Sequence, residues 1–541
     1  MQPSGYLCLV LHAHLPFVRH PEHEDFLEED WLFEAVTECY APLLMAVERL
    51  LDDGVPVKLA MSFTPPLTAM LDDPLLRARL DRYLDSRLDL AQREVERTKN
   101  DPAFAPAAAM YRDRFDAVKK YLRERCGGEL LNGVRELARD GALEVLGCSA
   151  THAFLPLIQQ RASQDAQVAA GIASHESFFG RPPAGIWLPE CGYAPGVDEV
   201  LADHGVRFFF METHGVLEGR PAPRYGPYAP VVTPSGVAVF ARDPECSQQV
   251  WSAAEGYPGD PVYRDFYRDI GWDLDMDQVR PFLHSDGSRS FTGLKYHRIT
   301  GKTDQKLPYD PAAAKEKVRE HARHFAASRA EQAERLSSQL RRPILMTAPY
   351  DAELFGHWWF EGPDFIEHVF REMAGRDEVV AVTPSEYLEK EGILQLASPA
   401  FSSWGDGGYA AMWLSPENDW VWPHLHHAQD RMVDLTRRFG ESSGDAKRAL
   451  TQAAKELLLA QSSDWPFIMR TATSATYATK RFEEHLTNFL ALDRALVSGN
   501  VEPVALARME ARTPVFPFLD ARVFDPSAMR KVMAEAASDR S

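Results

Sequence analysis

Short apolar runs alternate with longer amphipathic stretches over the first 390 residues of the chain. Apolar runs of this length predict strands, and the stretches between them have the 3.6-residue periodicity of helices, as in 31–51 and 163–179. The expected strands are 6–11, 57–61, 143–146, 185–188, 206–210, 237–240, 344–347 and 379–382. This alternation indicates a parallel sheet. Its length, with polar residues just after several strands, favours a barrel over an open sheet.

Two regions depart from this alternation. Between about 73 and 139 the chain is helical and charged, which predicts a helical insertion on the barrel. Near the C-terminus, three long helical patterns occur, at 420–439, 445–463 and 475–498. We therefore expect a barrel domain at 1–398, with a loop region at about 215–262, and a C-terminal helical domain at 399–541.

Charge narrows the classes of partner. The 541 residues include 59 Lys plus Arg and 79 Asp plus Glu, for a net charge of −20, which argues against nucleic acid and anionic membranes. A neutral polysaccharide fits this balance, although an acidic surface also serves simply to keep a protein soluble. The apolar run 6–11 is too short for a signal peptide or a membrane span, so we expect a cytoplasmic protein. The six cysteines are scattered, which predicts reduced and mostly buried thiols.

The most informative motif is 346–362, MTAPYDAELFGHWWFEG, which follows an expected strand. Asp351, Glu353 and His357 stand among aromatic residues that include Trp358. An acid at the end of a buried strand can hold a proton while the aromatic rings stack on the apolar faces of sugars. The motif therefore predicts one wall of a sugar-binding cleft, and we expect the helical domain to complete that cleft.

A second acid, Glu190, lies in WLPECGY at 187–193, again after an expected strand. Two carboxyls at different strand ends can serve as nucleophile and general acid/base in glycoside chemistry. A single strand-end glutamate is more often a salt-bridge or cap residue. The surrounding Trp, Pro, Gly and Tyr favour a site, with Glu190 as the partner of Asp351.

Three histidines, His12, His14 and His152, also follow expected strands. They are suited to hydrogen bonding with sugar hydroxyls and to orienting a carboxylate. The His-x-His spacing also suits zinc, but the usual supporting carboxylate is missing because Ala13 stands between the first two histidines. We therefore predict no metal and no cofactor, and keep zinc as an alternative.

Five further residues are candidates for sugar contacts. Trp404 and Trp413 lie in a Gly-rich stretch without a helical face to fill, so exposed rings are one interpretation and interdomain packing is the other. Trp272 and Arg264 can close another side of the cleft or belong to a packed helix. Asp464, at the end of an apolar helix, can bind sugar hydroxyls or cap the helix.

Five motifs in order carry a family resemblance. They are HAHLPF (12–17), GCSATHAFLP (147–156), WLPECGY (187–193), APYDAELFGHWWFEG (348–362) and SSDWPF (462–467). Together they resemble the five ordered regions of glycoside hydrolase family 57. Over nearly its whole length, including the helical domain, the chain is most similar to the α-1,4-glucan branching enzymes of that family.

The resemblance implies an α/β fold with an incomplete (β/α)7 barrel, and a retaining mechanism. It makes Glu190 the nucleophile and Asp351 the general acid/base. The implied substrate contacts are His12, His152, Trp272, Trp404 and Asp464. The implied reaction cleaves an α-1,4 link of a glucan such as amylose or a glycogen-like polymer and transfers the chain to a 6-hydroxyl.

Two positions depart from the family or are hard to place. Thr471–Thr473 stands where related enzymes often carry Gly-Gln, and Tyr257 is our assignment for the tyrosine that covers the site in relatives. The alternatives are an α-amylase or 4-α-glucanotransferase on the same scaffold, a zinc-dependent hydrolase or deacetylase, and an inactive glucan-binding protein. The sequence does not predict an oligomeric state.

Overall fold

The computed structural model describes residues 2–252 and 256–525, and the chain divides into two compact units. Unit 1 consists of the residues up to Met61, Met70–Glu144 and Asp243–Tyr387. Unit 2 consists of Ser62–Ala69, Val145–Arg242 and the residues from Leu388 onward. Each unit is therefore assembled from stretches that are distant in sequence, while the domain boundary after residue 398 stays a prediction.

The strands of unit 1 bring the first predicted motif next to the most informative one. Strand β1 (Gly5–Ala13) pairs in parallel with β8 (Ile344–Asp351) and with β9 (Val379–Ala381). All three were expected, and two of them run further than the apolar pattern, so that the register sets His12 of β1 directly beside Asp351 of β8. Both β1 and β8 are buried along most of their length, which is why they read as nearly continuous apolar runs.

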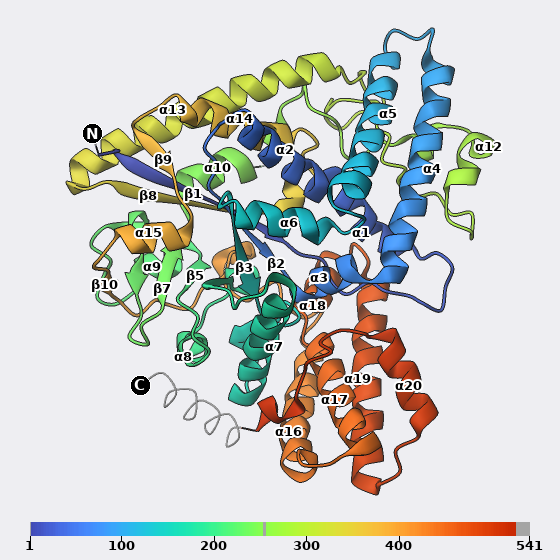
Figure 1. The fold of residues 1–541 in the computed structure, drawn as a ribbon, viewed down its shortest axis with the longest axis vertical. Coiled ribbons are helices and arrows are strands. Elements are labelled where there is room, and N and C mark those ends of the chain that lie inside the picture. Colours follow the sequence, from blue (N-terminus) through green and yellow to red (C-terminus); the bar gives the residue numbers. More distant parts are fainter. Residues whose placement is uncertain (1, 253–255, 526–541) are drawn as a thin grey trace. The chain divides into compact units, whose positions relative to one another are not determined.

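Three helices cover this part of unit 1. Helix α13 (Pro311–Leu340) packs on α14 (Gly362–Ala374), which packs on α2 (Ala41–Asp52) (Figure 1). The long helix α13 has a sequence-encoded start, because the Asp310 carboxylate accepts hydrogen bonds from the first-turn amides and Pro311 is preset for a helix.

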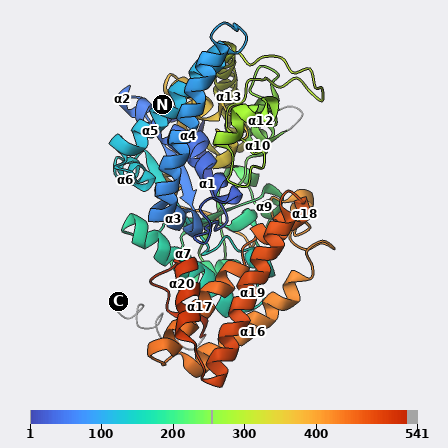
Figure 2. The ribbon, with the colours of Figure 1, turned by 90° about the vertical axis from the view of Figure 1, so that its right-hand side faces the viewer.

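The predicted helical insertion at 73–139 contains three helices. Helices α4 (Pro74–Thr98) and α5 (Ala105–Lys120) lie side by side in Figures 1 and 2, and α6 (Leu130–Arg139) follows a π-helical turn at Tyr121–Arg125. Asp73 caps α4 by accepting hydrogen bonds from two amides of its first turn. The insertion is thus an ordered helical element of unit 1.

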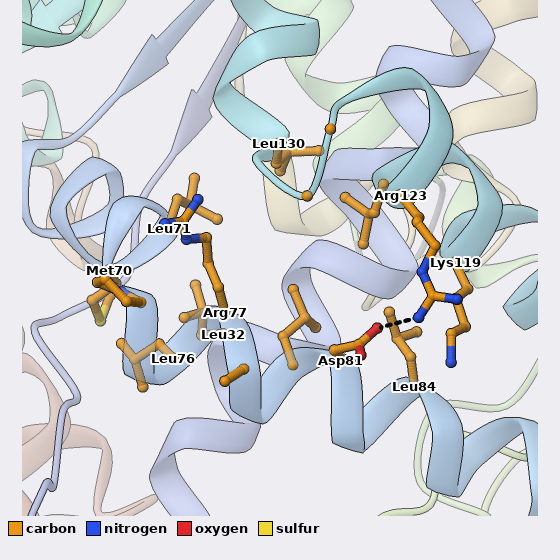
Figure 3. A pocket seen from close by; sticks show the side chains of 16 residues that line it. Leu32, Met70, Leu71, Leu76, Arg77, Asp81, Leu84, Lys119, Arg123 and Leu130 are labelled. Atoms are coloured by element: carbon orange, nitrogen blue, oxygen red, sulfur yellow. Dashed lines mark hydrogen bonds and ion pairs between the residues drawn. The ribbon is translucent and has the colours of Figure 1, made fainter.

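A pocket of about 390 Å³ is lined mainly by residues of this insertion, together with Leu32, Met70 and Leu71 (Figure 3). Leu76 and Leu84 of α4, Leu130 of α6 and other apolar side chains line it. At its margin, an Arg123 amino group lies 3.3 Å from the Asp81 carboxylate. The residues that line this pocket include none of the predicted site residues.

Unit 2 contains the second group of strands. They are β3 (Leu143–Cys148), β4 (Gly185–Trp187), β5 (Phe208–Met211), β6 (Val231–Val232), β7 (Ala238–Ala241) and β10 (Gln395–Leu396). Strands β3, β4, β5 and β7 pair in parallel in that order. The prediction of a parallel sheet holds for them, whereas β6 pairs antiparallel with β7 and β10 adds to β6 in parallel. The two-residue length of β6 and β10 explains why no apolar run announced them.

Unit 2 contains helices that follow its strands and a separate group of helices near the C-terminus. Helix α7 (Arg161–Phe179) follows β3 and ends at Gly180, which has a left-handed backbone. The C-terminal helices are α16 (Val421–Phe439), α17 (Gly444–Ala460), α18 (Asp464–Thr471), α19 (Ala475–Ser498) and α20 (Pro503–Arg512). Among them α17 packs along α19, as Figure 2 shows.

The other helices and one strand are short. They are α1 (Asp30–Glu34), β2 (Leu59–Phe63), α3 (Pro65–Asp72), α8 (Val197–Asp203), α9 (Thr213–Leu217), α10 (Pro244–Trp251), α11 (Ile270–Asp273), α12 (Met276–Val279) and α15 (Pro384–Lys390). Of the helices described, none is long and apolar enough to cross a membrane. All six cysteines are buried, as predicted. The α/β class with helical additions is confirmed.

We expect Gly171→Ala to destabilise unit 2 by about 1–3 kcal/mol, because overpacking at a tight contact forces backbone shifts. Gly171 lies inside α7, and a Cβ there would stand 2.1 Å from the carbonyl oxygen of Cys148 at the end of β3. Thermal unfolding followed by calorimetry measures the change. Gly180→Ala is a poor control because of its positive φ. Ala170→Gly makes the opposite change in the same helix, since it removes a Cβ from a buried position. An unchanged unfolding temperature in Gly171→Ala would contradict the close approach.

Candidate active site

Glu190 stands at the end of β4 in an unusual backbone conformation. Its φ of 61° and the φ of 49° at Cys191 both lie in the left-handed region, where residues other than glycine are uncommon. Two consecutive residues of this kind store strain that the surrounding structure must hold, and such strain concentrates at functional sites. The turn aims a carboxylate that is mostly buried but keeps 13% of its side-chain surface accessible.

Two side chains donate to the Glu190 carboxylate. The indole Nε1 of Trp404 donates to Oε2 over 2.9 Å, and the Ser463 hydroxyl donates to Oε1 over 3.0 Å. The Trp404 amide also donates to the Glu190 carbonyl oxygen over 3.0 Å. Each carboxylate oxygen thus accepts a hydrogen bond, and the two bonds together fix the orientation of the carboxylate.

His152 extends this arrangement by one step. Its Nδ1 lies 2.8 Å from the Ser463 oxygen, and because the serine proton points to Glu190, Nδ1 must be the donor. The Ser463 amide donates to the His152 carbonyl oxygen over 3.0 Å. Nδ1 itself lies 3.8 Å from Oε1 of Glu190. His152, with φ of 56°, therefore positions the serine that positions Glu190.

Ser463 lies in the motif SSDWPF, but its contact with Glu190 was not predicted from the sequence. The signal was its place next to Asp464, which was selected instead. Asp464 begins α18 and accepts a hydrogen bond from the Ser462 hydroxyl. The structure therefore places Asp464 one residue from the hydroxyl that contacts Glu190.

The two tryptophans of the Gly-rich stretch differ in their surroundings. Trp404 is partly accessible and packs edge-on against Trp187 with ring centroids 5.0 Å apart. Trp413, predicted as a sugar contact, is instead fully buried and stacks on Phe154 at 4.4 Å. The chain at Gly405 passes so close to the Trp413 ring that a Cβ would lie 2.7 Å away. Trp413 therefore packs inside unit 2.

Replacing Trp404 by Phe should lower kcat by about 10- to 100-fold, because a hydrogen bond to a charged acceptor contributes about 1.5–3 kcal/mol. The substitution keeps an aromatic ring against Trp187 and removes only the donor. Trp413→Phe is the matched control, since the Trp413 Nε1 has no hydrogen-bond partner within the described residues. Steady-state kinetics on amylose measure both, and equal losses would contradict a specific role for the Trp404 donor.

In unit 1, Asp351 ends β8 with its side chain partly accessible and His12 beside it in the register. His12 itself is buried, and its ring stacks on that of His14 with centroids 5.7 Å apart. The backbone amide of His14 donates to Oε1 of Glu353 over 3.1 Å. The structure thus brings together the predicted residues of the first and fourth motifs.

Four aromatic side chains, two of them exposed and two partly buried, form a row on unit 1. Trp358, 52% exposed, stacks on Phe266 with centroids 4.2 Å apart, and Trp272, 47% exposed, lies edge-on to Phe291 at 4.9 Å. The Lys295 ammonium joins the two pairs, because it lies 4.1 Å from the Phe266 ring and 4.2 Å from the Phe291 ring. We call these four rings the aromatic row. Such rings match the apolar faces of sugars.

Two sequence interpretations on unit 1 are corrected. Arg264, predicted to close one side of the cleft, is buried: its guanidinium lies 3.5 Å from the Glu38 carboxylate and 4.4 Å from the centre of the Phe360 ring. A buried charge of this kind requires an acidic partner. Tyr257 does not cover the site, because it is buried and its hydroxyl is hydrogen-bonded to His324 of α13 over 2.7 Å. Both residues therefore support the fold of unit 1.

Two family models match the chain. The model for glycosyl hydrolase family 57 matches residues 8–397, and the model for the C-terminal region of 1,4-alpha-glucan branching enzymes matches residues 424–524. The second match falls on the helices α16–α20. The two matches together cover the barrel motifs and the C-terminal helices that the sequence pattern predicted.

Known proteins resemble the chain over nearly its whole length. A 1,4-alpha-glucan branching enzyme of Thermococcus kodakarensis is 35% identical over 95% of this chain and 77% of its own length. The structure of the alpha-amylase AmyC of Thermotoga maritima is 44% identical with a TM-score of 0.90, covering 96% of this chain and 99% of AmyC. That of a branching enzyme of Pyrococcus horikoshii is 35% identical with a TM-score of 0.87, covering 96% of this chain and 97% of that enzyme. The predicted family fold is confirmed, and the chain belongs to glycoside hydrolase family 57.

Proposed function

We propose that this enzyme is a 1,4-α-glucan branching enzyme, which cleaves an α-1,4 link and transfers the released chain to a 6-hydroxyl of a glucan. The observation that carries the proposal is the frame of donors on the Glu190 carboxylate, in a chain whose C-terminal helices match a branching-enzyme model. The similarity to the Thermococcus branching enzyme over 95% of the chain supports the same reaction. The proposed substrate is a cytoplasmic, amylose- or glycogen-like polymer.

Glu190 is the proposed nucleophile. Its ionised carboxylate, oriented by Trp404 and Ser463, attacks the anomeric carbon, and the bond from that carbon to the glycosidic oxygen breaks. Asp351 is the proposed general acid, which gives its proton to the leaving oxygen. In the second half-reaction, Asp351 takes the proton of the incoming 6-hydroxyl while the oxygen of that hydroxyl attacks the anomeric carbon and displaces Glu190. Two displacements at one carbon retain the α configuration.

Binding groups complete the proposal. The aromatic row offers flat apolar rings to the faces of glucose units, and Asp464, His12, His14 and His152 provide polar groups for sugar hydroxyls. Because water as the acceptor would give hydrolysis, the branching outcome depends on holding the 6-hydroxyl and excluding water. No metal or cofactor enters these steps.

Incubation of the purified protein with amylose tests the proposal. Debranching with isoamylase and NMR of the anomeric protons then report new α-1,6 links. New links that are lost in Glu190→Gln support branching. An unchanged polymer with both the wild type and the variant would contradict it and favour a glucan-binding protein. Loss of activity with a chelator would favour the zinc-dependent alternative.

Hydrolysis is the second candidate, because the similar Thermotoga structure with 44% identity is that of an alpha-amylase. The same incubation separates the two. Shorter linear chains with new reducing ends and without α-1,6 protons indicate an amylase. Redistributed linear chains with a constant number of reducing ends indicate a 4-α-glucanotransferase.

A further inference from the structure

The turn that follows Asp351 is fastened to a π-helical segment at Ala35–Tyr40, which joins α1 to α2. The last two residues of the π-helical segment contact the first two residues after Asp351. The Cys39 thiol donates to the Ala352 carbonyl oxygen over 2.8 Å, and the Tyr40 hydroxyl donates to Glu353. π-Helical turns are rare and occur often at functional sites.

The same segment holds the far end of the turn. His357 Nδ1 donates to Oε2 of Glu38 over 2.9 Å. Gly356 has a φ of 123°, and a Cβ there would stand 2.0 Å from the Glu38 carbonyl oxygen, so only glycine permits this approach. Although burial raises the pKa of the Glu38 carboxyl, Arg264 and His357 outweigh it and hold that pKa below its usual range. The turn is therefore attached to the π-helical segment at both ends.

Glu353 is the point where three elements meet. Its Oε1 accepts from the Tyr40 hydroxyl of the π-helical segment and, over 3.1 Å, from the His14 amide just beyond the end of β1. The residue two before His14 in β1, His12, is the register partner of Asp351. Glu353 thus ties the end of β1 and the π-helical segment to the end of β8, two residues from Asp351.

The surroundings of Glu353 also change the pKa of its carboxyl. Burial raises the pKa of its carboxyl to about 7, while the donors Tyr40 and His14 act in the opposite direction. The ionisable groups near it are Tyr40, Cys39 and His14, and Asp351 lies two residues earlier, at the end of β8. Burying a carboxyl costs free energy that a glutamine of the same shape would avoid, so its presence here indicates a functional role for Glu353.

We propose that Glu353, held by Tyr40 and the His14 amide, is the positioning residue that aims Asp351 at the glycosidic oxygen for proton transfer. Glu353 acts through Asp351 and does not itself touch the substrate. The inference rests on the proposed function, because it requires Asp351 to be the general acid. It predicts that losing the hydrogen bonds that hold Glu353 slows only reactions whose leaving group needs a proton.

The test compares two substrates of different leaving-group quality. Cleavage of amylose needs a proton on the leaving oxygen, whereas an α-maltooligoside of 2,4-dinitrophenol releases a stable phenolate without one. We expect Tyr40→Phe and Glu353→Gln to lower kcat/KM on amylose by about 10- to 100-fold and on the aryl substrate by less than about threefold. The ratio of these two values is the readout that a purely structural defect leaves unchanged.

Unit 1 offers a chemically matched control. The Tyr309 hydroxyl donates to the buried carboxylate of Glu361 over 2.7 Å, and burial raises the pKa of that carboxyl too. Tyr309→Phe and Glu361→Gln therefore remove the same kind of contact ten residues from Asp351. We expect them to lower the unfolding temperature by a similar amount and to leave the substrate ratio at the wild-type value.

Asp351→Asn serves as the reference for the ratio. If this variant depends on the leaving group and the Glu353 and Tyr40 variants do not, the positioning role is wrong while the proposed function stands. If Asp351→Asn shows no such dependence, the acid role of Asp351 is wrong and the inference falls with it. Equal ratios in the Tyr40 and Tyr309 variants would also overturn the inference, because both would then be structural.

Discussion

Replacing Glu190 by Gln should reduce glycosyl transfer on amylose by at least about 1,000-fold, because the step that forms the glycosyl-enzyme loses its nucleophile. The amide keeps the shape of the side chain and can still accept from Trp404, so the fold of unit 2 is preserved. New α-1,6 links and new reducing ends, measured over hours, report the residual rate. Mass spectrometry with a fluorinated glucosyl donor checks the same step, since only the wild type gains the mass of a sugar.

Glu212 provides the control for this experiment. It follows β5 just as Glu190 follows β4, its side chain is 17% exposed, and it pairs with Arg242 over 2.9 Å. Glu212→Gln therefore removes a carboxylate of similar burial from a neighbouring strand end. We expect it to retain at least about one tenth of the wild-type rate, the cost of a partly exposed ion pair. Residual activity above about 1% in Glu190→Gln would contradict its assignment as nucleophile.

Glu190 and Asp351 were selected from the sequence because each follows a short apolar run that predicts a strand. The apolar runs located β4 and the first half of β8, and Glu190 and Asp351 lie shortly after those runs stop. The residues that follow a buried strand can be read directly from the sequence. The register that sets His12 beside Asp351 did not follow from the apolar runs, because both residues lie beyond the expected strands 6–11 and 344–347 and are more than 300 residues apart in sequence.

The direction of a side chain in a loop, outside helices and strands, could not be predicted from the sequence pattern. Trp404 and Trp413 lie in the same Gly-rich stretch, yet one donates to Glu190 and the other stacks on Phe154. Which ring turns inward depends on how Gly405 packs, and no periodicity carries that information. Arg264 illustrates the same limit, because its acid partner Glu38 is more than 200 residues away in sequence.

The π-helical segment at Ala35–Tyr40 was hidden for a different reason. Its residues fit an uninterrupted helical pattern over 31–51, and an extra residue in one turn barely changes the apolar periodicity. Its partners lie more than 300 residues further along the chain, at Ala352 and Glu353. Ser463 escaped notice because a serine hydroxyl becomes functional only through its neighbours, here Glu190 and His152.

Asp351→Asn should lower kcat/KM on amylose by about 100- to 10,000-fold, the usual contribution of general acid catalysis, and that on a dinitrophenyl maltooligoside by less than about 10-fold. The asparagine keeps the end of β8 and its pairing with β1 but has no proton to transfer to an oxygen. On the aryl substrate the glycosyl-enzyme still forms at Glu190 and then accumulates, because no base activates the acceptor hydroxyl.

Azide separates a missing base from a damaged site. As an anion it needs no base, so it should attack the accumulated glycosyl-enzyme and raise kcat on the aryl substrate by about 10-fold or more. Because the attack is the second displacement at the anomeric carbon, the product is the α-glycosyl azide, which NMR distinguishes from the β anomer. Glu190→Gln, tested in parallel, should give no α-glycosyl azide, since it forms no glycosyl-enzyme. A β-glycosyl azide from Asp351→Asn would mean direct displacement without Glu190, and would contradict the retaining mechanism in which Asp351 serves both half-reactions.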